Sequence, residues 1–412
     1  MALNYIWVGF FLISFIVALI KLIFFGDTEV FSRIIDGTFS SSKTAFEISL
    51  GLTGVMTLWL GIMNIGEKGG AIRILSRVIS PFFSRLFPEI PKDHPALGQI
   101  IMNFSANMLG LANAATPIGL KAMQSMQDLN KDKEKASNSQ IMFLVINTAG
   151  FALLPMTILT FRAQYHAKNP TDVFIPILLA TLFSTFFGVL IVALRQKIKI
   201  FDKVLISWAL GLGLVVSAII WGVTRFDSDQ VAKASKLGSS LILFGIIISF
   251  ISLAFSRKVN VFDAFVEGAK EGFQTVIKII PYIVGMLVAI GVFRSSGCMD
   301  FLMNGFRHFF LAVGCNTDFV DAIPTALMRP LSSSGASGLT IDLMNTKGVD
   351  SFPARLSGII QGSADTTFYI VALYFGSVGV KNSRYAITYG LLTDLAGFIA
   401  AIFMAYLFFG RS

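Results

Sequence analysis

Charged residues are scarce in this 412-residue chain: Asp, Glu, Lys and Arg make up 14% of it, against about 25% in soluble globular domains. Hydrophobic residues make up 54%, and Phe alone occurs 40 times. So little charge excludes an ordinary soluble domain and predicts an integral membrane protein in contact with lipid. The net charge of +9 is typical of cytoplasmic loops. Without a soluble basic face, it does not indicate nucleic-acid binding.

Cysteine and histidine are also rare. The two cysteines, Cys298 and Cys315, allow at most one disulfide and have no metal-ligand spacing, and the three histidines are scattered in loops. The chain contains no HExxH, GxSxG or Walker sequence. We therefore predict no enzyme activity, no metal site, and no cofactor other than a coupling Na⁺ or H⁺.

Long apolar runs are abundant and predict nine membrane crossings, with the N-terminus inside and the C-terminus outside. The predicted spans are 4–25, 46–65, 141–161, 172–194, 204–221, 237–255, 275–293, 355–375 and 385–409. Segment 27–43 is predicted to be a surface connection. Segment 67–94 has the apolar periodicity of a basic amphipathic helix at the membrane interface, and segment 260–272 is predicted to be amphipathic.

Polar residues interrupt two of the spans. Gln361 and Asp365 lie inside the apolar run 357–375, and helical spacing predicts that they share a face. An ionisable residue at the bilayer centre costs at least about 2.5 kcal/mol, so it is expected to face a cavity, a partner or an ion. Asn147 and Thr148 interrupt 141–161 in the same way.

Two further segments, 95–126 and 323–344, combine apolar residues with Gly, Asn, Ser and Pro, which signal helix breaks. If 95–126 enters the membrane and returns as a hairpin, the basic segment 67–94 and the loop 121–135 lie on the same cytoplasmic side, as the positive-inside rule favours. If it crosses, the basic segment lies outside. We therefore favour re-entrant hairpins.

The elements occur twice in the same order: a span, an amphipathic connection, a polar Gly-rich segment, a hydrophilic loop, a broken span and a final span. With hairpins, the two halves are inverted, which is a recurring plan of transporters. The sequence thus predicts an all-α polytopic membrane protein of two inverted repeats with re-entrant hairpins and broken transmembrane helices. The predicted division is 1–200, connecting helices in 201–258, and 259–412.

Two stretches of the sequence resemble a known family. Residues 103–117, NFSANMLGLANAATP, are similar to spore maturation protein A. Residues 329–338, RPLSSSGASG, and 361–369, QGSADTTFY, are similar to spore maturation protein B. The resemblance covers nearly the whole chain as a natural fusion. It implies two Gate-type, nucleoside-recognition repeats, as in concentrative nucleoside transporters, and we expect a multi-pass protein of the bacterial cytoplasmic (inner) membrane.

The polar residues of the hairpins and breaks are the candidate site. Asp365 is the leading candidate, for proton or cation coupling or for a hydrogen bond to substrate. Arg329 either binds an anionic substrate or neutralises Asp365. The serines either line a pocket or only allow close helix packing, and the amides and hydroxyls can coordinate Na⁺. The candidate substrate- and ion-binding residues are Asn103, Asn107, Asn113, Thr116, Asn147, Thr148, Arg329, Ser332, Ser333, Ser334, Ser337, Gln361, Ser363, Asp365, Thr366, Thr367 and Asp394.

Two functions fit these features. The first is an H⁺- or Na⁺-coupled secondary transporter of a small polar metabolite, nucleoside-like or anionic. The alternative is an envelope-assembly factor, either a flippase for a lipid-linked substrate or a scaffold for peptidoglycan or spore-cortex enzymes, which the Phe-rich surface and the basic segment 67–94 favour. Besides lipids and a small-molecule substrate, we expect a homo-oligomer, most simply a dimer through 204–255.

Overall fold

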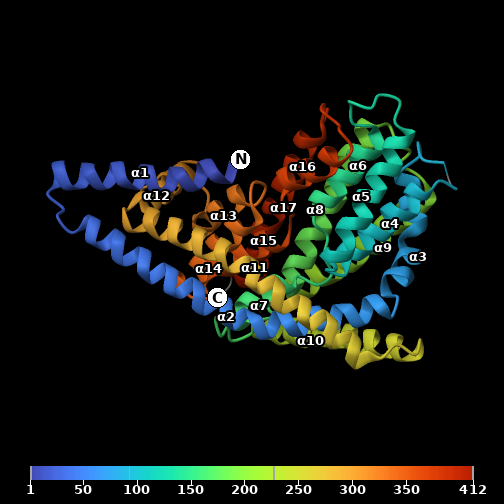
Figure 1. Ribbon diagram of the computed structural model, residues 1–412, viewed down its shortest axis with the longest axis horizontal. Helices are drawn as coiled ribbons and strands as arrows, with labels where there is room; N and C mark the ends of the chain where they lie inside the picture. The colour runs from blue at the N-terminus through green and yellow to red at the C-terminus, as the bar shows by residue number, and fades with distance from the viewer. Residues whose placement is uncertain (1, 92, 226–227, 411–412) are drawn as a thin grey trace.

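The computed structural model describes residues 2–91, 93–225 and 228–410, in which there are helices and no β-strand (Figure 1). The helices are α1 (Ala2–Phe25), α2 (Val30–Lys68), α3 (Ala71–Leu86), α4 (Pro95–Met108), α5 (Ala112–Leu129), α6 (Asn138–Thr148), α7 (Met156–Gln164), α8 (Phe174–Arg195), α9 (Lys203–Arg225), α10 (Ser228–Ser256), α11 (Val261–Ser295), α12 (Cys298–Ala312), the 3-10 helix η1 (Val320–Ala322), α13 (Ile323–Met328), α14 (Ser333–Lys347), α15 (Phe352–Gly362), α16 (Thr367–Ser377) and α17 (Ala386–Phe409).

Seven of the described helices are long and apolar enough to cross a membrane: α1, α2, α8, α9, α10, α11 and α17. The pairs α6–α7 and α15–α16 are each interrupted, so that no single half reaches the length of a span. Counted as two broken spans, they complete the nine crossings that the sequence predicts. The structure is therefore that of a polytopic all-α membrane protein.

Two predicted boundaries are wrong. Segment 27–43 is not a surface connection, because α2 begins at Val30, and segment 260–272 is not a separate helix, because it continues into the span as α11. α2 has 39 residues and α11 has 35, whereas about 20 residues cross the hydrocarbon core. Both helices therefore cross at a tilt or extend beyond the core.

Small residues allow these two long helices to pack closely against each other. α2 and α11 run side by side along the molecule (Figure 1), and a Cβ on Gly37 would lie 2.5 Å from Oγ of Ser295. Near their other ends, a Cβ on Gly268 would lie 2.4 Å from the carbonyl oxygen of Leu60. The polar composition that suggested a loop in 27–43 instead lets two helix backbones approach closely.

The second half repeats the order of the first. The long helices α2 and α11 are each followed by an amphipathic helix (α3 or α12), a hairpin (α4–α5 or α13–α14), a broken span (α6–α7 or α15–α16) and a final span (α8 or α17). Equivalent helices pair in antiparallel fashion. For example, Gln196, just after α8, donates to the hydroxyl of Tyr385, just before α17, at 3.1 Å, and Ser184 of α8 donates to the carbonyl of Thr393 of α17 at 3.1 Å. This is the relation that an inverted repeat produces.

The loops at the two ends of the molecule also indicate inversion. Loop 130–137, between the hairpin and the broken span of the first half, pairs with loop 378–385, between the broken span and the final span of the second half. A bridge joins Lys135 to Asn382, and Lys381 lies 2.6 Å from Glu134. We call this end, which also carries Arg195 and Lys197, the basic end.

At the opposite end, the loop between the hairpin and the broken span belongs to the second half, and the end of the broken span belongs to the first half. Ion pairs around a buried arginine link the two halves there. Arg162, at the end of the first broken span, lies 2.8 Å from Asp172 and 3.0 Å from Asp350, which is in the loop between the hairpin and the broken span of the second half. Arg355 also contacts Asp172, at 2.9 Å. The guanidinium of Arg162 is fully buried, so these carboxylates supply the partners that a buried charge requires.

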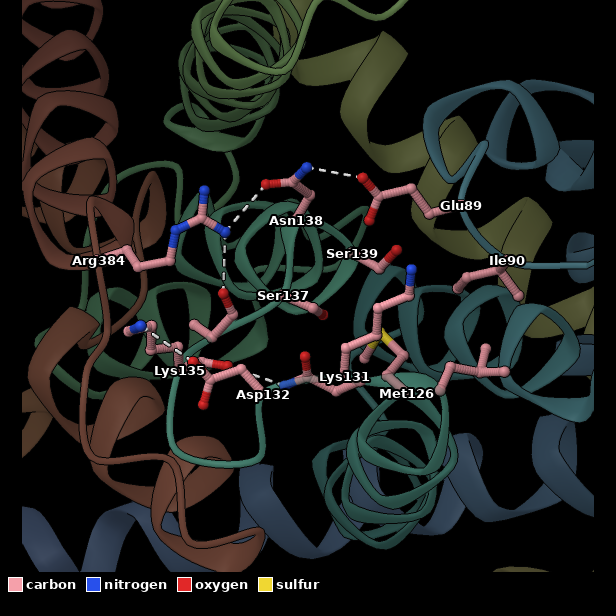
Figure 2. Close-up of a pocket in the computed structure, with 13 residues that line it drawn as sticks. Glu89, Ile90, Met126, Lys131, Asp132, Lys135, Ser137, Asn138, Ser139 and Arg384 are labelled. Carbon is pink, nitrogen blue, oxygen red and sulfur yellow. Dashed lines mark hydrogen bonds and ion pairs between the residues drawn. The ribbon is translucent and has the colours of Figure 1, made fainter.

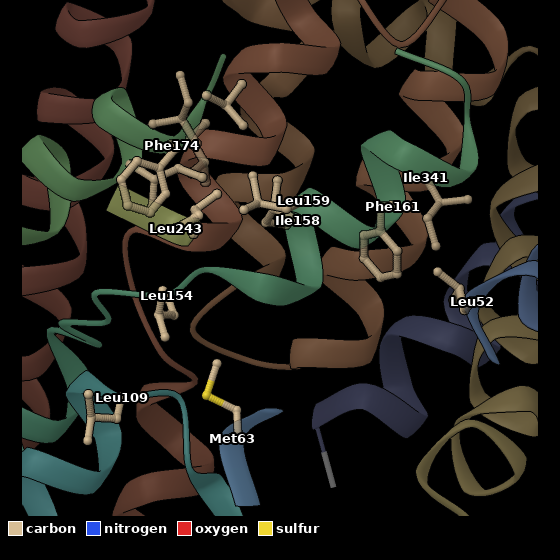
Figure 3. Packing of buried hydrophobic residues seen from close by; sticks show 14 of the residues in the cluster. Leu52, Met63, Leu109, Leu154, Ile158, Leu159, Phe161, Phe174, Leu243 and Ile341 are labelled. Carbon is tan, nitrogen blue, oxygen red and sulfur yellow. The ribbon is translucent and has the colours of Figure 1, made fainter. Parts of the chain in front are cut away.

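The main core cluster lies around the short helix α7, as Figure 3 shows. Ile158, Leu159 and Phe161 of α7 belong to a cluster that also includes Leu52 of α2 and Ile341 of α14. A helix of nine residues is not stable alone in water. Packing against both halves therefore holds α7 in place and fixes the break that precedes it.

Candidate functional site

The two broken spans meet at their interruptions. Thr148 ends α6, and its carbonyl accepts a hydrogen bond from the amide of Asp365, 2.9 Å away in the other break. Gly150 follows with a φ of +62°, a conformation that L side chains rarely adopt. A Cβ at this position would lie 2.8 Å from the backbone of Ala364 and Asp365, so glycine allows the two breaks to touch.

Each break is also tied to the hairpin of its own half. The amide of Leu153 donates to the carbonyl of Met108 at 2.7 Å, and the amide of Phe368 donates to the carbonyl of Pro330 at 3.1 Å. The freed backbone groups of each break thus find partners inside the protein, as they must at membrane depth. Hairpins and breaks form one unit in each half.

A cavity of about 350 Å³ lies where these units meet. It is lined from both halves, and six of the predicted residues face it: Asn107, Asn147, Arg329, Ser333, Gln361 and Asp365. The sequence reasoning missed Phe104 and Phe151, whose rings stack at 6.1 Å between centroids and also line the cavity. Among 40 Phe residues, no pattern in the sequence distinguishes these two.

Amide side chains hold one another in each half of the cavity. Asn107 donates from Nδ2 to Oδ1 of Asn147 at 2.9 Å. In the second half, Nε2 of Gln361 donates to the hydroxyl of Ser337. The Oε1 atom of Gln361 is buried and has no hydrogen-bond partner among the described protein atoms.

Arg329 and Asp365 differ in how they are satisfied. Arg329 is buried and donates from Nε to the carbonyl of Ala364 at 2.9 Å and from Nη1 to the hydroxyl of Ser333 at 2.8 Å. Its Nη2 is 3.8 Å from Asp365, whose side chain is 50% exposed. Asp365 accepts a hydrogen bond from the amide of Thr366 at 2.7 Å. Arg329 therefore mainly holds the break, and Asp365 faces the cavity.

One predicted geometry is wrong. α15 ends at Gly362, so Asp365 lies in the break and does not share a helical face with Gln361. Both side chains still reach the cavity, because the chain turns between them.

The other predicted residues do not line this cavity. Asn103 is buried and donates to the carbonyl of Ala115 at 2.8 Å, which joins the two arms of the first hairpin. Ser332 caps α14 by accepting from the amide of Gly335 at 3.0 Å. Thr367 donates to Asp394 at 2.6 Å. Of the remainder, Thr148, Ser363 and Thr366 are buried, Thr116, Ser334 and Ser337 are half-buried, and the side chain of Asn113 is outside the described part of the structure.

A larger cavity, of about 650 Å³, opens at the basic end (Figure 2). None of the predicted residues lines it. As Figure 2 shows, its polar side chains bind one another: Arg384 donates to Asn138 at 3.1 Å, and Asn138 donates to Glu89 at 2.7 Å. We therefore regard the smaller cavity at the breaks as the candidate site.

Two inverted repeats that meet at broken helices around a polar cavity define the class of this chain, a multi-pass membrane protein with a polar cavity between its halves. The model of the Gate family, described as nucleoside recognition, matches residues 49–165 and 276–381, one segment in each half. The two segments together exceed half of the chain, and the protein belongs to this family. Its two Gate segments confirm the repeat that the sequence predicts.

Two relatives from Bacillus subtilis (strain 168) are similar to parts of the chain. Spore maturation protein A is 44% identical over 181 residues, which cover 44% of this chain and 89% of that protein. Spore maturation protein B is 48% identical over 174 residues, which cover 42% of this chain and 96% of that protein. These matches confirm the resemblance found in the sequence. No solved structure matches the chain.

Proposed function

We propose that this protein is a secondary transporter that carries a small polar metabolite of nucleoside-like chemistry across the membrane, driven by H⁺ or Na⁺. The observation that carries the proposal is the cavity at the breaks, which side chains of both inverted halves line. In transporters built from inverted repeats, substrates bind at the repeat interface beside discontinuous helices. The position of the cavity supports this role.

The chemistry of the lining supports a neutral substrate with hydroxyl and amide groups. Asp365 is half exposed and can accept hydrogen bonds, the amides of Asn107, Asn147 and Gln361 line the cavity, and the rings of Phe104 and Phe151 offer an apolar surface. Arg329 already donates to Ala364 and Ser333, which makes an anionic substrate the weaker candidate. The family's description, nucleoside recognition, supports the same class.

Few hydrogen bonds join the two breaks, and this favours movement between the halves. The bond from the Asp365 amide to the Thr148 carbonyl links them directly, whereas each break is separately tied to its own hairpin through Leu153 or Phe368. In the proposed cycle, each hairpin-and-break unit moves as a body and opens the cavity to one side or the other. Rocking of one repeat against the other is the usual form of alternating access.

Uptake into proteoliposomes tests the proposal. Purified protein is assayed with a panel of labelled nucleosides, nucleobases and small organic acids, under an imposed Na⁺ or H⁺ gradient. We expect uptake of at least one nucleoside-like compound that either gradient drives, and loss of that uptake in Gln361→Leu. The matched control is Gln124→Leu, which replaces an exposed glutamine on α5 away from the cavity. Folded protein without gradient-driven flux for any compound would overturn the proposal.

The names of the two relatives, spore maturation proteins A and B, favour a second candidate, an envelope-assembly factor that moves a lipid-linked substrate or holds peptidoglycan enzymes. Translocation of a fluorescent lipid-linked precursor in the same proteoliposomes separates the two. Under this alternative, lipid translocation occurs and nucleoside uptake does not.

A homo-oligomer also remains a prediction. α9 is the least buried of the seven candidate spans, with 6% of its apolar window buried inside the protein. Large apolar side chains such as Leu214 and Trp221 are exposed on it. This surface is consistent with a dimer through 204–255.

A further inference from the structure

Asp394 is a carboxylate buried deep in α17, behind the second break. Its side chain is about 1% exposed, and its Oδ2 accepts a single hydrogen bond, at 2.6 Å, from the hydroxyl of Thr367. Its other oxygen, Oδ1, is buried without a hydrogen-bond partner among the described protein atoms. One hydrogen bond is little compensation for a buried charge, which is normally paired or bound to a cation.

The charged groups that act on Asp394 are Arg329 in the hairpin turn and Asp365 in the break. Neither pairs with it: Arg329 forms no ion pair with Asp394 and directs its nitrogens to Ala364 and Ser333, and Asp365 has the same sign. The nearest hydroxyls of the neighbouring elements bind backbone carbonyls instead: Ser184 of α8 donates to Thr393 at 3.1 Å, and Thr148 of α6 donates to Val145 at 2.9 Å.

A second buried oxygen without a partner lies on the residue next to Thr367. The Oγ1 atom of Thr366 is buried and has no hydrogen-bond partner among the described protein atoms. Thr366 and Thr367 are the N-cap and first residue of α16. Hydroxyl and carboxylate oxygens are the ligands that small hard cations take. The contact of Asp394 with the Thr367 hydroxyl brings one oxygen of each kind together at the start of α16.

We propose that Asp394 binds the small monovalent cation, H⁺ or Na⁺, whose gradient drives transport, and that Thr367 is the positioning residue that links this cation to the substrate cavity. The coupling role rests on the proposed transport function, whereas cation binding stands by itself. Three consecutive residues make the link: Asp365 faces the cavity, Thr366 donates its amide to Asp365, and Thr367 donates its hydroxyl to Asp394. A cation bound at Asp394 fixes the orientation of Thr367 at the start of α16. Because Thr366 is next to Thr367 and binds Asp365, the position of Asp365 is fixed as well.

Two titrations of thermal stability, made without substrate, test the site. In one, NaCl replaces choline chloride at constant ionic strength. In the other, pH is varied without Na⁺. If Na⁺ binds, it raises the melting temperature of the wild type. If H⁺ binds instead, Na⁺ has no effect and the melting temperature falls as pH rises, because loss of the proton leaves a buried charge uncompensated. The two titrations therefore distinguish the two cations.

Asp394→Asn keeps the shape of the side chain and removes its charge. We expect this variant to lose the cation-dependent shift that the wild type shows, whereas Asp365→Asn retains it. Retention of the full shift in Asp394→Asn, or a wild type that responds to neither titration, would overturn the site. If Asp394→Asn does not fold, Thr367→Val and Thr367→Ser decide the question. Valine is expected to move the midpoint of the titration and serine to restore it, and equal midpoints would contradict the proposal.

The outcome is separate from that of the transport assay. A cation-dependent melting temperature with no flux would overturn transport and leave the site. Gradient-driven flux with no cation response in the wild type would leave transport and overturn the site.

Discussion

At the scale of single residues, the two charged groups of the cavity have different tasks. Arg329 is buried and satisfies the carbonyl of Ala364 in the second break, whereas Asp365 is half exposed and bound by one backbone amide. A buried group that loses its partner is costly, and an exposed one is not. Substitution of Arg329 should therefore lower stability, whereas substitution of Asp365 should change substrate binding and leave stability nearly unchanged.

Asp365→Asn is expected to preserve the fold and weaken substrate binding. Asparagine keeps an oxygen that can accept from the Thr366 amide, so the melting temperature should change little. The variant loses a charged acceptor in the cavity, and we expect substrate affinity to fall about tenfold, equivalent to ~1.4 kcal/mol. Equilibrium binding of a transported nucleoside measures this. Unchanged affinity would show that Asp365 does not contact substrate.

Arg329→Ala is expected to destabilise the protein by about 1–3 kcal/mol, because it leaves the buried carbonyl of Ala364 without its donor. Since Asp365 is not the main partner of Arg329, the double variant Arg329→Ala/Asp365→Asn should recover little. Arg73→Ala, which removes an exposed arginine of α3, is the control and should be neutral. Full recovery in the double variant, judged by thermal unfolding in detergent, would instead identify the Arg329–Asp365 contact as the main interaction.

At the scale of elements, the breaks depend on close contact between two irregular segments. α7 and α16 are short helices of 9 and 11 residues that begin where the breaks meet, and their places are set by packing. Gly150 lies at the contact, with its Cα hydrogens facing the backbone of Ala364 and Asp365. A side chain here would separate the two halves of the site.

Gly150→Ala is expected to destabilise the protein by at least about 1–2 kcal/mol from its left-handed conformation alone, and to abolish uptake by pushing the breaks apart. Gly98→Ala is the matched control: Gly98 lies inside α4 with no heavy atom within 4 Å of its would-be Cβ. That change should leave stability equal or raise it by about 0.5–1 kcal/mol. Thermal unfolding and uptake of both variants check this. Wild-type behaviour of Gly150→Ala would mean that the breaks separate readily.

At the scale of the whole molecule, antiparallel pairing of equivalent helices and the exchange of loops between the ends both follow from inversion. Loop 130–137 meets 378–385 at the basic end, and Arg162 meets Asp350 at the opposite end. The positive-inside rule predicts that the basic end lies in the cytoplasm. Equivalent loops of the two halves should therefore face opposite sides of the membrane.

Cysteine labelling tests this topology. In a background in which Cys298 and Cys315 are replaced, single cysteines are introduced at the exposed positions Lys131, Lys347 and Lys381. We expect a membrane-impermeant reagent to label Lys347→Cys from outside the cell, and Lys131→Cys and Lys381→Cys only after the cytoplasmic side is opened. Labelling of Lys131→Cys and Lys347→Cys from the same side would contradict the inverted arrangement.

The sequence by itself determined the membrane class, the two repeats and the positions of the hairpins and breaks. Little charge, long apolar runs and polar residues inside them are local properties of the sequence. A polar group at membrane depth must face a cavity or bind a buried partner. Six cavity-lining residues, Asp365 among them, could be predicted for that reason. The full lengths of α2 and α11 could not be predicted, because their small polar residues favour a helix only when a second backbone packs against them.

Only the tertiary structure decided which partner each polar residue takes. Local polarity shows that Asn103, Arg329 and Asp394 need partners, but those partners lie 12, 35 and 27 residues away and are chosen by packing. For the same reason, the stacked rings of Phe104 and Phe151 become part of the site only when α4 and the first break meet. Packing also places Asp365 in the cavity and Asp394 behind the break, and so separates two carboxylates that are chemically alike.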